Sequence, residues 1–166
     1  MRKISTLTFT LLTIVLLLSK YATAQEVNFN TLKSQYDAGL ADKRVDAITK
    51  LAALYKTPES LSVVKQALLA DVDTNVREAA CEALRAFSET QIKEDGLIET
   101  AFSAALYALS DKEESVRKKS ADVILSSFRK KADLERLRDY LKQTARRDPI
   151  HSYEVLSLTL RLHPSA

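Results

Sequence analysis

The sequence predicts an all-α protein, an α-solenoid of about four antiparallel helical pairs that follows a cleaved signal peptide. Three observations support this fold class. Helix-breaking residues are rare, with two Gly and three Pro, whereas Ala, Leu, Lys, Glu and Arg are abundant. Apolar residues recur at steps of three and four. A pattern of aliphatic and charged residues also returns after 40 positions, as stacked helical pairs require.

The first 24 residues have the features of a secretory signal peptide. They begin with a basic pair, continue with an apolar run over 4–18 and end in Ala-Thr-Ala at 22–24. We expect cleavage after Ala24. The alternative is an uncleaved membrane anchor, but a helix needs about 20 apolar residues to cross a bilayer, more than this run supplies. The mature domain, 25–166, would then be periplasmic or secreted, without stable membrane insertion.

Turn signals divide the mature domain into eight expected helices. Thr57-Pro58 and Asp148-Pro149 each place a capping side chain before a Pro at the first helical position, and Asp95-Gly96 marks another break. Short connections make neighbouring helices antiparallel. The expected helices are 28–40, 42–56, 58–70, 73–88, 95–109, 112–130, 132–146 and 149–162.

Periodic apolar residues indicate which side of these helices faces the core. In the second helix, Val45, Ile48, Ala52 and Tyr55 share one side. The equivalent inward sets in the fourth and sixth helices are Val76, Ala80, Leu84 and Phe87, and Val116, Ser120, Ile124 and Phe128.

Two segments share a signature of the form D-x4-V-R at a period of 40. Asp71 precedes Val76-Arg77 by the interval that separates Asp111 from Val116-Arg117. One helical pair cannot bury its apolar side alone, so repeated pairs predict a stack.

These segments resemble HEAT repeats over about residues 58–130. In that family the Asp lies in the turn between two helices, and Val-Arg begins the second helix. We interpret 41–46 as a degenerate third copy, with Asp46 where the Arg is expected; the last pair, 132–162, lacks the motif. The resemblance implies a structural ladder of hydrogen bonds between neighbouring turns rather than a catalytic pair. Its members are Asp71, Arg77, Asp111 and Arg117.

No catalytic or cofactor motif is recognisable in the sequence. There is no P-loop, no Gly-rich phosphate turn and no Gly-x-Ser-x-Gly elbow. His151 and His163 lack partners at zinc-site spacing. Cys81, the single cysteine, stands in an Ala-rich helical context typical of a core residue; a reactive thiol or an intermolecular bridge is the alternative. We therefore expect no enzymatic activity, no metal and no cofactor.

Charge balance argues against a nucleic-acid partner. The leader carries three of the 25 basic residues and none of the acidic ones, so the mature domain has 22 of each sign. Nucleic-acid-binding proteins normally show a basic excess. The charge is uneven, however, with −5 over 25–111 and +5 over 112–166, which predicts an acidic end and a basic end for an elongated solenoid.

The resemblance also implies that the second helix of each pair lines a concave face, where a partner would bind. An ordinary solvated surface is the alternative for each residue there. The partner-binding candidates are Lys50, Glu78, Glu82, Arg85, Lys118, Asp122 and Arg129.

Taken together, these features predict a non-enzymatic scaffold or adaptor of the bacterial cell envelope that binds another protein. One alternative is an architectural subunit that self-associates through its oppositely charged ends. A second is an accessory factor or lyase, because some HEAT-like proteins resemble bilin lyases. HEAT-like DNA glycosylases are disfavoured by export and by the balanced charge. The basic C-terminal half would contact an acidic protein, anionic lipid or another copy.

Overall fold

The computed structural model describes residues 28–88, 96–148 and 156–157, and every regular element in them is helical. The all-α prediction is therefore confirmed for this part of the chain. None of the helices there is long and apolar enough to cross a membrane. The helices are α2 (Phe29–Ala38), α3 (Ala41–Leu54), α4 (Pro58–Ala70), α5 (Thr74–Ala83), the 3-10 helix η1 (Leu84–Phe87), α6 (Leu97–Ala108), α7 (Glu114–Ser127) and α8 (Lys131–Arg147).

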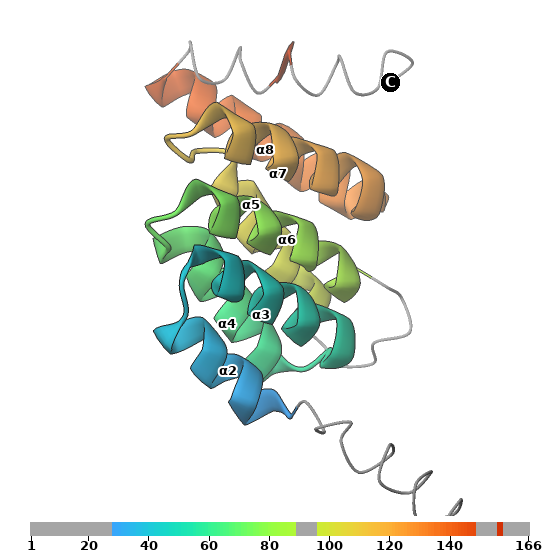
Figure 1. The fold of residues 1–166 in the computed structure, drawn as a ribbon. Helices are drawn as coiled ribbons and strands as arrows, with labels where there is room; N and C mark the ends of the chain where they lie inside the picture. Colours follow the sequence, from blue (N-terminus) through green and yellow to red (C-terminus); the bar gives the residue numbers. More distant parts are fainter. Residues whose placement is uncertain (1–27, 89–95, 149–155, 158–166) are drawn as a thin grey trace, which may run out of the picture.

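The helices form two layers, as expected for stacked antiparallel pairs. In Figure 1, α3, α5 and α7 follow one another in the front layer, with α4, α6 and α8 behind them. Three complete pairs are described, α2 with α3, α4 with α5 and α6 with α7, and α8 follows the third. The eighth predicted helix, 149–162, lies almost entirely outside the described residues, so the predicted total of four pairs stays a prediction.

Side-chain caps fix where several helices begin. The Asn28 side chain accepts a hydrogen bond from the Thr31 backbone N–H at 2.8 Å and starts α2. Thr57 accepts one from the Ser60 N–H at 3.3 Å, directly before a Pro, so α4 begins where the sequence predicts. Asp73 accepts bonds from two backbone N–H groups at the start of α5.

Several of the predicted helices extend beyond the observed ends. The segment 28–40 forms a helix only to Ala38, and 112–130 forms one only over Glu114–Ser127. The late start of α7 has a local cause, because the Asp111 carboxylate holds the Glu113 N–H at 2.8 Å in a non-helical turn. The segment 73–88 is divided between α5 and a tighter 3-10 turn.

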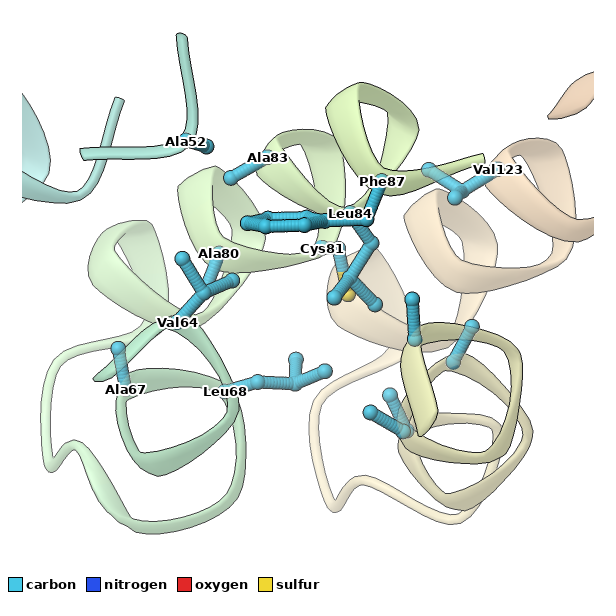
Figure 2. Close-up of a cluster of buried hydrophobic side chains, with 14 of the residues drawn as sticks. Ala52, Val64, Ala67, Leu68, Ala80, Cys81, Ala83, Leu84, Phe87 and Val123 are labelled. Atoms are coloured by element: carbon cyan, nitrogen blue, oxygen red, sulfur yellow. The ribbon is translucent and has the colours of Figure 1, made fainter. Parts of the chain in front are cut away.

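The core lies between the two layers. Figure 2 shows Val64, Leu68, Ala80, Leu84 and Phe87 converging there. Each large buried apolar side chain of this kind contributes about 1.5–3 kcal/mol to stability. The predicted inward residues of the fourth and sixth helices are all buried, so this assignment is confirmed.

A polar clamp holds α8 against α6. Arg136 pairs with Glu99 at 2.6 Å, donates to Ser103 at 3.2 Å and lies over the Phe102 ring, with its guanidinium carbon 4.8 Å from the ring centre. Leu137, beside it, is buried. This contact fixes which side of α8 faces solvent.

Candidate functional site

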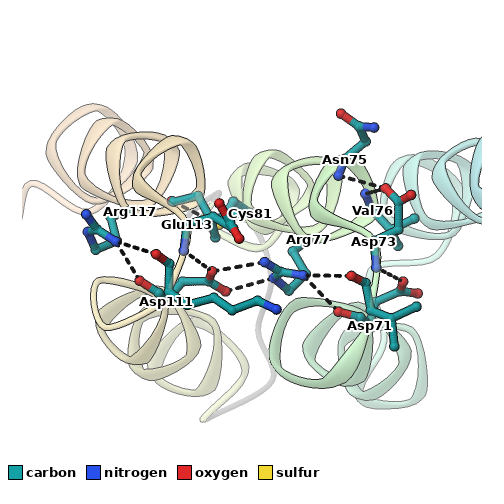
Figure 3. A network of polar contacts seen from close by, with 12 residues as sticks. Asp71, Asp73, Asn75, Val76, Arg77, Cys81, Asp111, Glu113 and Arg117 are labelled. Carbon is teal, nitrogen blue, oxygen red and sulfur yellow. Dashed lines mark hydrogen bonds and ion pairs between the residues drawn. The ribbon is translucent and has the colours of Figure 1, made fainter.

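The turns between paired helices carry a ladder of arginine and aspartate side chains. Arg77 donates from Nε and Nη2 to the two carboxylate oxygens of Asp111, at 2.8 and 3.1 Å. Its Nη1 donates to the backbone carbonyls of Asp71 and Val72, at 3.0 and 3.3 Å. Figure 3 shows Arg77 between the two turns. One side chain therefore closes its own turn and joins it to the turn of the next pair.

Arg44 makes the same contacts one pair earlier. Its Nε and Nη2 donate to Asp71 at 2.8 Å each, and its Nη1 donates to the Gly39 carbonyl at 3.0 Å. The prediction that Asp46 occupies the arginine position of this repeat is therefore wrong. Asp46 instead accepts hydrogen bonds from Lys50 on its own helix and Gln35 on α2.

The backbone explains why the position was misassigned. In the structure, the ladder arginine is the fourth residue after the helix cap in each pair. The N–H groups of Arg44, Arg77 and Arg117 donate to the carbonyls of Leu40, Asp73 and Glu113, respectively. In the first pair the Arg precedes the Val instead of following it, so aligning the signature on Val45 places the arginine position two residues too late, at Asp46 instead of Arg44.

The electrostatics of the ladder favour its ionised form. Burial alone would raise the pKa of Asp71, but hydrogen bonds from Arg44 and the Asp73 N–H, together with the charges of Arg44 and Arg77, hold that pKa below its usual value. The hydrogen bonds from Arg77 to Asp111 raise the pKa of the guanidinium despite its burial. Arg117 extends the ladder with bonds to the carbonyls of Asp111 and Lys112, at 2.8 and 3.0 Å. These interactions give the charged side chains of the ladder a structural role.

A second polar cluster lies on the solvent-facing side of the front layer, which we call the B face. The B face comprises the outward side chains of α3, α5, η1 and α7. Arg85 on η1 is the centre of the cluster. The guanidinium donates to Glu82 at 2.6 Å on the preceding helix and to Ser127 at 3.2 Å on α7. It also contacts Asp122 and Ser126 on α7.

One further ion pair joins the same two helices. Lys119 on α7 lies 3.6 Å from Glu82 on α5. The cluster thus links neighbouring repeats across the front layer, as the ladder does at the turns. We call it the Arg85 cluster; its members are Glu82, Arg85, Lys119, Asp122, Ser126 and Ser127.

The other predicted binding residues are distributed along the B face. Lys50 pairs with Asp46 at 2.7 Å, and Lys118 pairs with Glu114 at 2.5 Å, each one turn away on the same helix. The remaining two candidates differ in exposure. Glu78 is half-buried on α5, and Arg129, beyond the end of α7, is exposed.

The structure therefore brings three of the seven candidates together: Glu82, Arg85 and Asp122. Lys119, Ser126 and Ser127 also belong to their cluster and were not predicted from the sequence. The spacing of Lys119 and Ser126 places both on one side of α7. Nothing in the sequence indicates that they meet side chains of the Arg85 cluster more than 30 positions earlier in the chain.

Cys81 is buried in the core between repeats (Figure 2). Burial, helped by the nearby negative charge of Asp111, raises the pKa of its thiol to about 12. The thiol is protonated at neutral pH and contacts the Val116 carbonyl, with sulfur and oxygen 3.9 Å apart. This environment suits core packing and disfavours nucleophilic chemistry.

The predicted acidic end does not coincide with the first helical pair. Between Phe29 and Leu54 there are four basic and three acidic side chains, whereas residues 57–88 hold three basic and five acidic ones. The acidic excess therefore lies further along the chain: residues 57–88 carry −2, and residues 89–111, with one basic and five acidic side chains, carry −4. The basic excess is at the other end, in and before α8.

Within residues 28–88, 96–148 and 156–157, no three His, Cys, Asp or Glu side chains are grouped so that they could hold a metal ion. His151 and His163 lie outside these residues.

The family model of the HEAT repeat matches residues 61–91, which include most of α4 and all of α5 and η1. This match confirms the predicted resemblance to the HEAT-repeat family. Neither a curated protein nor a solved structure matches the chain.

Proposed function

We propose that the protein is an exported, non-enzymatic adaptor or scaffold of the bacterial cell envelope that binds another protein through its B face. The HEAT-repeat match indicates a helical-repeat module for protein interaction. The observation that carries the proposal is the Arg85 cluster, because it presents fixed charges of both signs where two repeats meet.

The cluster is prepared for binding before a partner arrives. Arg85 is held from two helices, and its side chain is 29% exposed. Ordering a long side chain on binding costs about 0.5–1.5 kcal/mol, and prior fixation lowers that cost. The carboxylates of Glu82 and Asp122 remain 50% and 43% exposed. Their unused lone pairs are available to hydrogen-bond donors of a partner.

The distribution of charge indicates the kind of partner. Basic and acidic side chains are interspersed over the B face, so it presents no extended surface of a single sign. Such a surface suits a protein with complementary polar groups better than a polyanion. We expect the association to weaken as salt is added, because the participating charges are partly exposed.

Cross-linking in cells followed by pull-down tests this proposal. The B-face variant combines Glu82→Lys, Arg85→Glu and Lys118→Glu. A matched control, Asp37→Lys with Lys33→Glu and Lys65→Glu, makes the same net charge change on exposed positions of α2 and α4. Thermal melts establish that both variants fold. The proposal predicts that partners captured by the wild type are lost from the B-face variant and kept by the control.

Retention of every partner by the folded B-face variant would contradict binding through the B face.

Export is tested separately by the mass of the protein recovered from its natural host. A chain beginning at Gln25 is expected, and a chain that retains residues 1–24 would contradict export with cleavage.

Self-assembly through oppositely charged ends is less well supported as an alternative. The first helical pair has no acidic excess to meet the basic end of another copy. Light scattering at low and high salt distinguishes the two: a monomer under both conditions excludes self-assembly, and a salt-sensitive oligomer would favour it.

A further inference from the structure

Positive charge is concentrated at one end of the stack. Residues 129–147, which comprise α8 and the two positions before it, contain eight basic and three acidic side chains. Six of the basic side chains are exposed, which leaves their charge available to solvent or to a binding partner. They are Arg129, Lys130, Arg138, Lys142, Arg146 and Arg147.

Three of these cations form a straight row, which we call the basic stripe: Arg138, Lys142 and Arg146. Residues four apart lie on the same side of a helix, about 6 Å from one another along its axis. The other side of α8 is occupied, because Leu137 is buried and Arg136 is held by α6. The stripe therefore faces outward.

The stripe is only weakly neutralised by its own helix. Asp139 lies 3.5 Å from Arg138 and 3.9 Å from Lys142, but the side chains of all three residues are more than half exposed. Exposed ion pairs of this kind are weak, because solvent screens the attraction between the two charges. A net positive row consequently remains at the surface.

We propose that the basic stripe binds the surface of an anionic lipid bilayer. Together with the other exposed cations of 129–147, the stripe makes a group of six, within the four to eight Lys and Arg typical of surfaces that bind anionic lipid headgroups. A bilayer is flat, so a row of cations on an outward helix reaches it without a cleft. This binding is electrostatic, since the apolar side of α8 is already packed on α6.

A protein partner is the less favoured occupant of this surface. Protein interfaces are centred on aromatic and aliphatic anchors surrounded by a polar rim. On α8, the described residues offer one exposed large apolar side chain, Leu134, at 45% exposure. The stripe consists of charge without an apolar centre, which matches a headgroup surface better.

The position of α8 leaves the B face accessible at the same time. Figure 1 shows α8 in the layer behind α3, α5 and α7. A molecule attached to a bilayer through the stripe would still present its B face to a protein. The proposal stands independently of the protein-binding function, because the two surfaces share no residue.

Vesicle co-sedimentation with the chain 25–166 tests the proposal. All described helices lie within this chain, and omitting the predicted leader prevents its apolar run from inserting into the vesicles. The vesicles are phosphatidylcholine alone, or phosphatidylcholine with about one third phosphatidylglycerol. The stripe variant is Arg138→Glu, Lys142→Glu and Arg146→Glu. The control, Lys33→Glu, Lys65→Glu and Lys112→Glu, changes the net charge equally at exposed positions elsewhere.

We expect the wild type to bind the anionic vesicles and not the neutral ones, and to dissociate at about 0.5 M salt. Each cation near such a surface contributes about a fivefold gain in affinity, so the stripe variant should lose at least about 100-fold. The control should lose less than about fivefold. Failure of the wild type to bind anionic vesicles, or equal losses in both folded variants, would overturn the proposal, even if an acidic protein bound the stripe.

Discussion

Arg77 on α5 holds both carboxylate oxygens of Asp111, which belongs to the turn of the following pair. The two side chains are only 5% and 12% exposed. Arg44 and Asp71 repeat this relationship one pair earlier. Each arginine also donates to a carbonyl of its own turn, so the same group shapes one repeat and fastens it to the next. Helix positions in this stack are therefore coupled through a few buried charges.

Arg44 should stabilise the fold through the ladder, whereas Asp46 should not. Arg44→Ala leaves the largely buried carboxylate of Asp71 without its bidentate donor, and we expect a loss of about 2 kcal/mol in unfolding free energy. Asp46→Ala removes exposed contacts and should cost less than about 0.5 kcal/mol. Urea denaturation of the two variants measures both values. A larger loss for Asp46→Ala would restore the register first expected from the sequence.

The stability supplied by Asp71 should disappear in acid. Its folded-state pKa lies below its ordinary value of about 3.9, so the ionised group stabilises the fold above about pH 4. The contribution is lost as the pH falls through the folded-state pKa. The gap in unfolding free energy between the wild type and Asp71→Asn should therefore be widest near pH 6 and shrink below pH 4. The exposed position Asp139→Asn serves as the control, and a gap for Asp71→Asn that is constant with pH would contradict the assignment.

Gly39 is required by a close backbone approach. A Cβ there would lie 2.3 Å from the Gln35 carbonyl oxygen and 2.9 Å from the Lys43 Cβ, and the Gly39 carbonyl is itself a ladder acceptor. Gly39→Ala should cost about 2 kcal/mol or more. Gly96→Ala is the comparison, because Gly96 has open space but a φ of 95°, for which about 1 kcal/mol is expected. Thermal melts that rank the two losses in the opposite order would refute the argument.

The sequence predicted most of the helices because their signals are local. Thr57 caps α4 as expected, and the three- and four-residue periodicity of Val76, Ala80 and Leu84 placed the buried side of α5 correctly. Helix ends were less predictable. The 3-10 turn over Leu84–Phe87 has no composition that distinguishes it from a continuing helix, and the packing of Phe87 in the core accompanies it.

The candidate site could be predicted only in part, because its contacts join residues distant in sequence. Spacing put Glu82 and Arg85 on one side of the predicted helix 73–88, but it could not show that Arg85 meets Asp122 on α7. The role of Arg44 was missed because the signature was aligned on Val45, whereas the structure aligns the repeats on their helix caps. The cap of this helix, Leu40, makes no side-chain capping bond, so the sequence carries no signal for the correct alignment.

The ladder is expected to fasten neighbouring helical pairs into one stack. A double-mutant cycle with Arg77→Ala, Asp111→Ala and the double variant measures that coupling directly through urea denaturation. Arg77→Ala alone should cost about 3 kcal/mol, since it leaves a largely buried carboxylate unpaired. A coupling energy of at least about 1.5 kcal/mol is predicted. Additive losses, with a coupling below about 0.3 kcal/mol, would show that the two side chains act independently and would contradict the ladder.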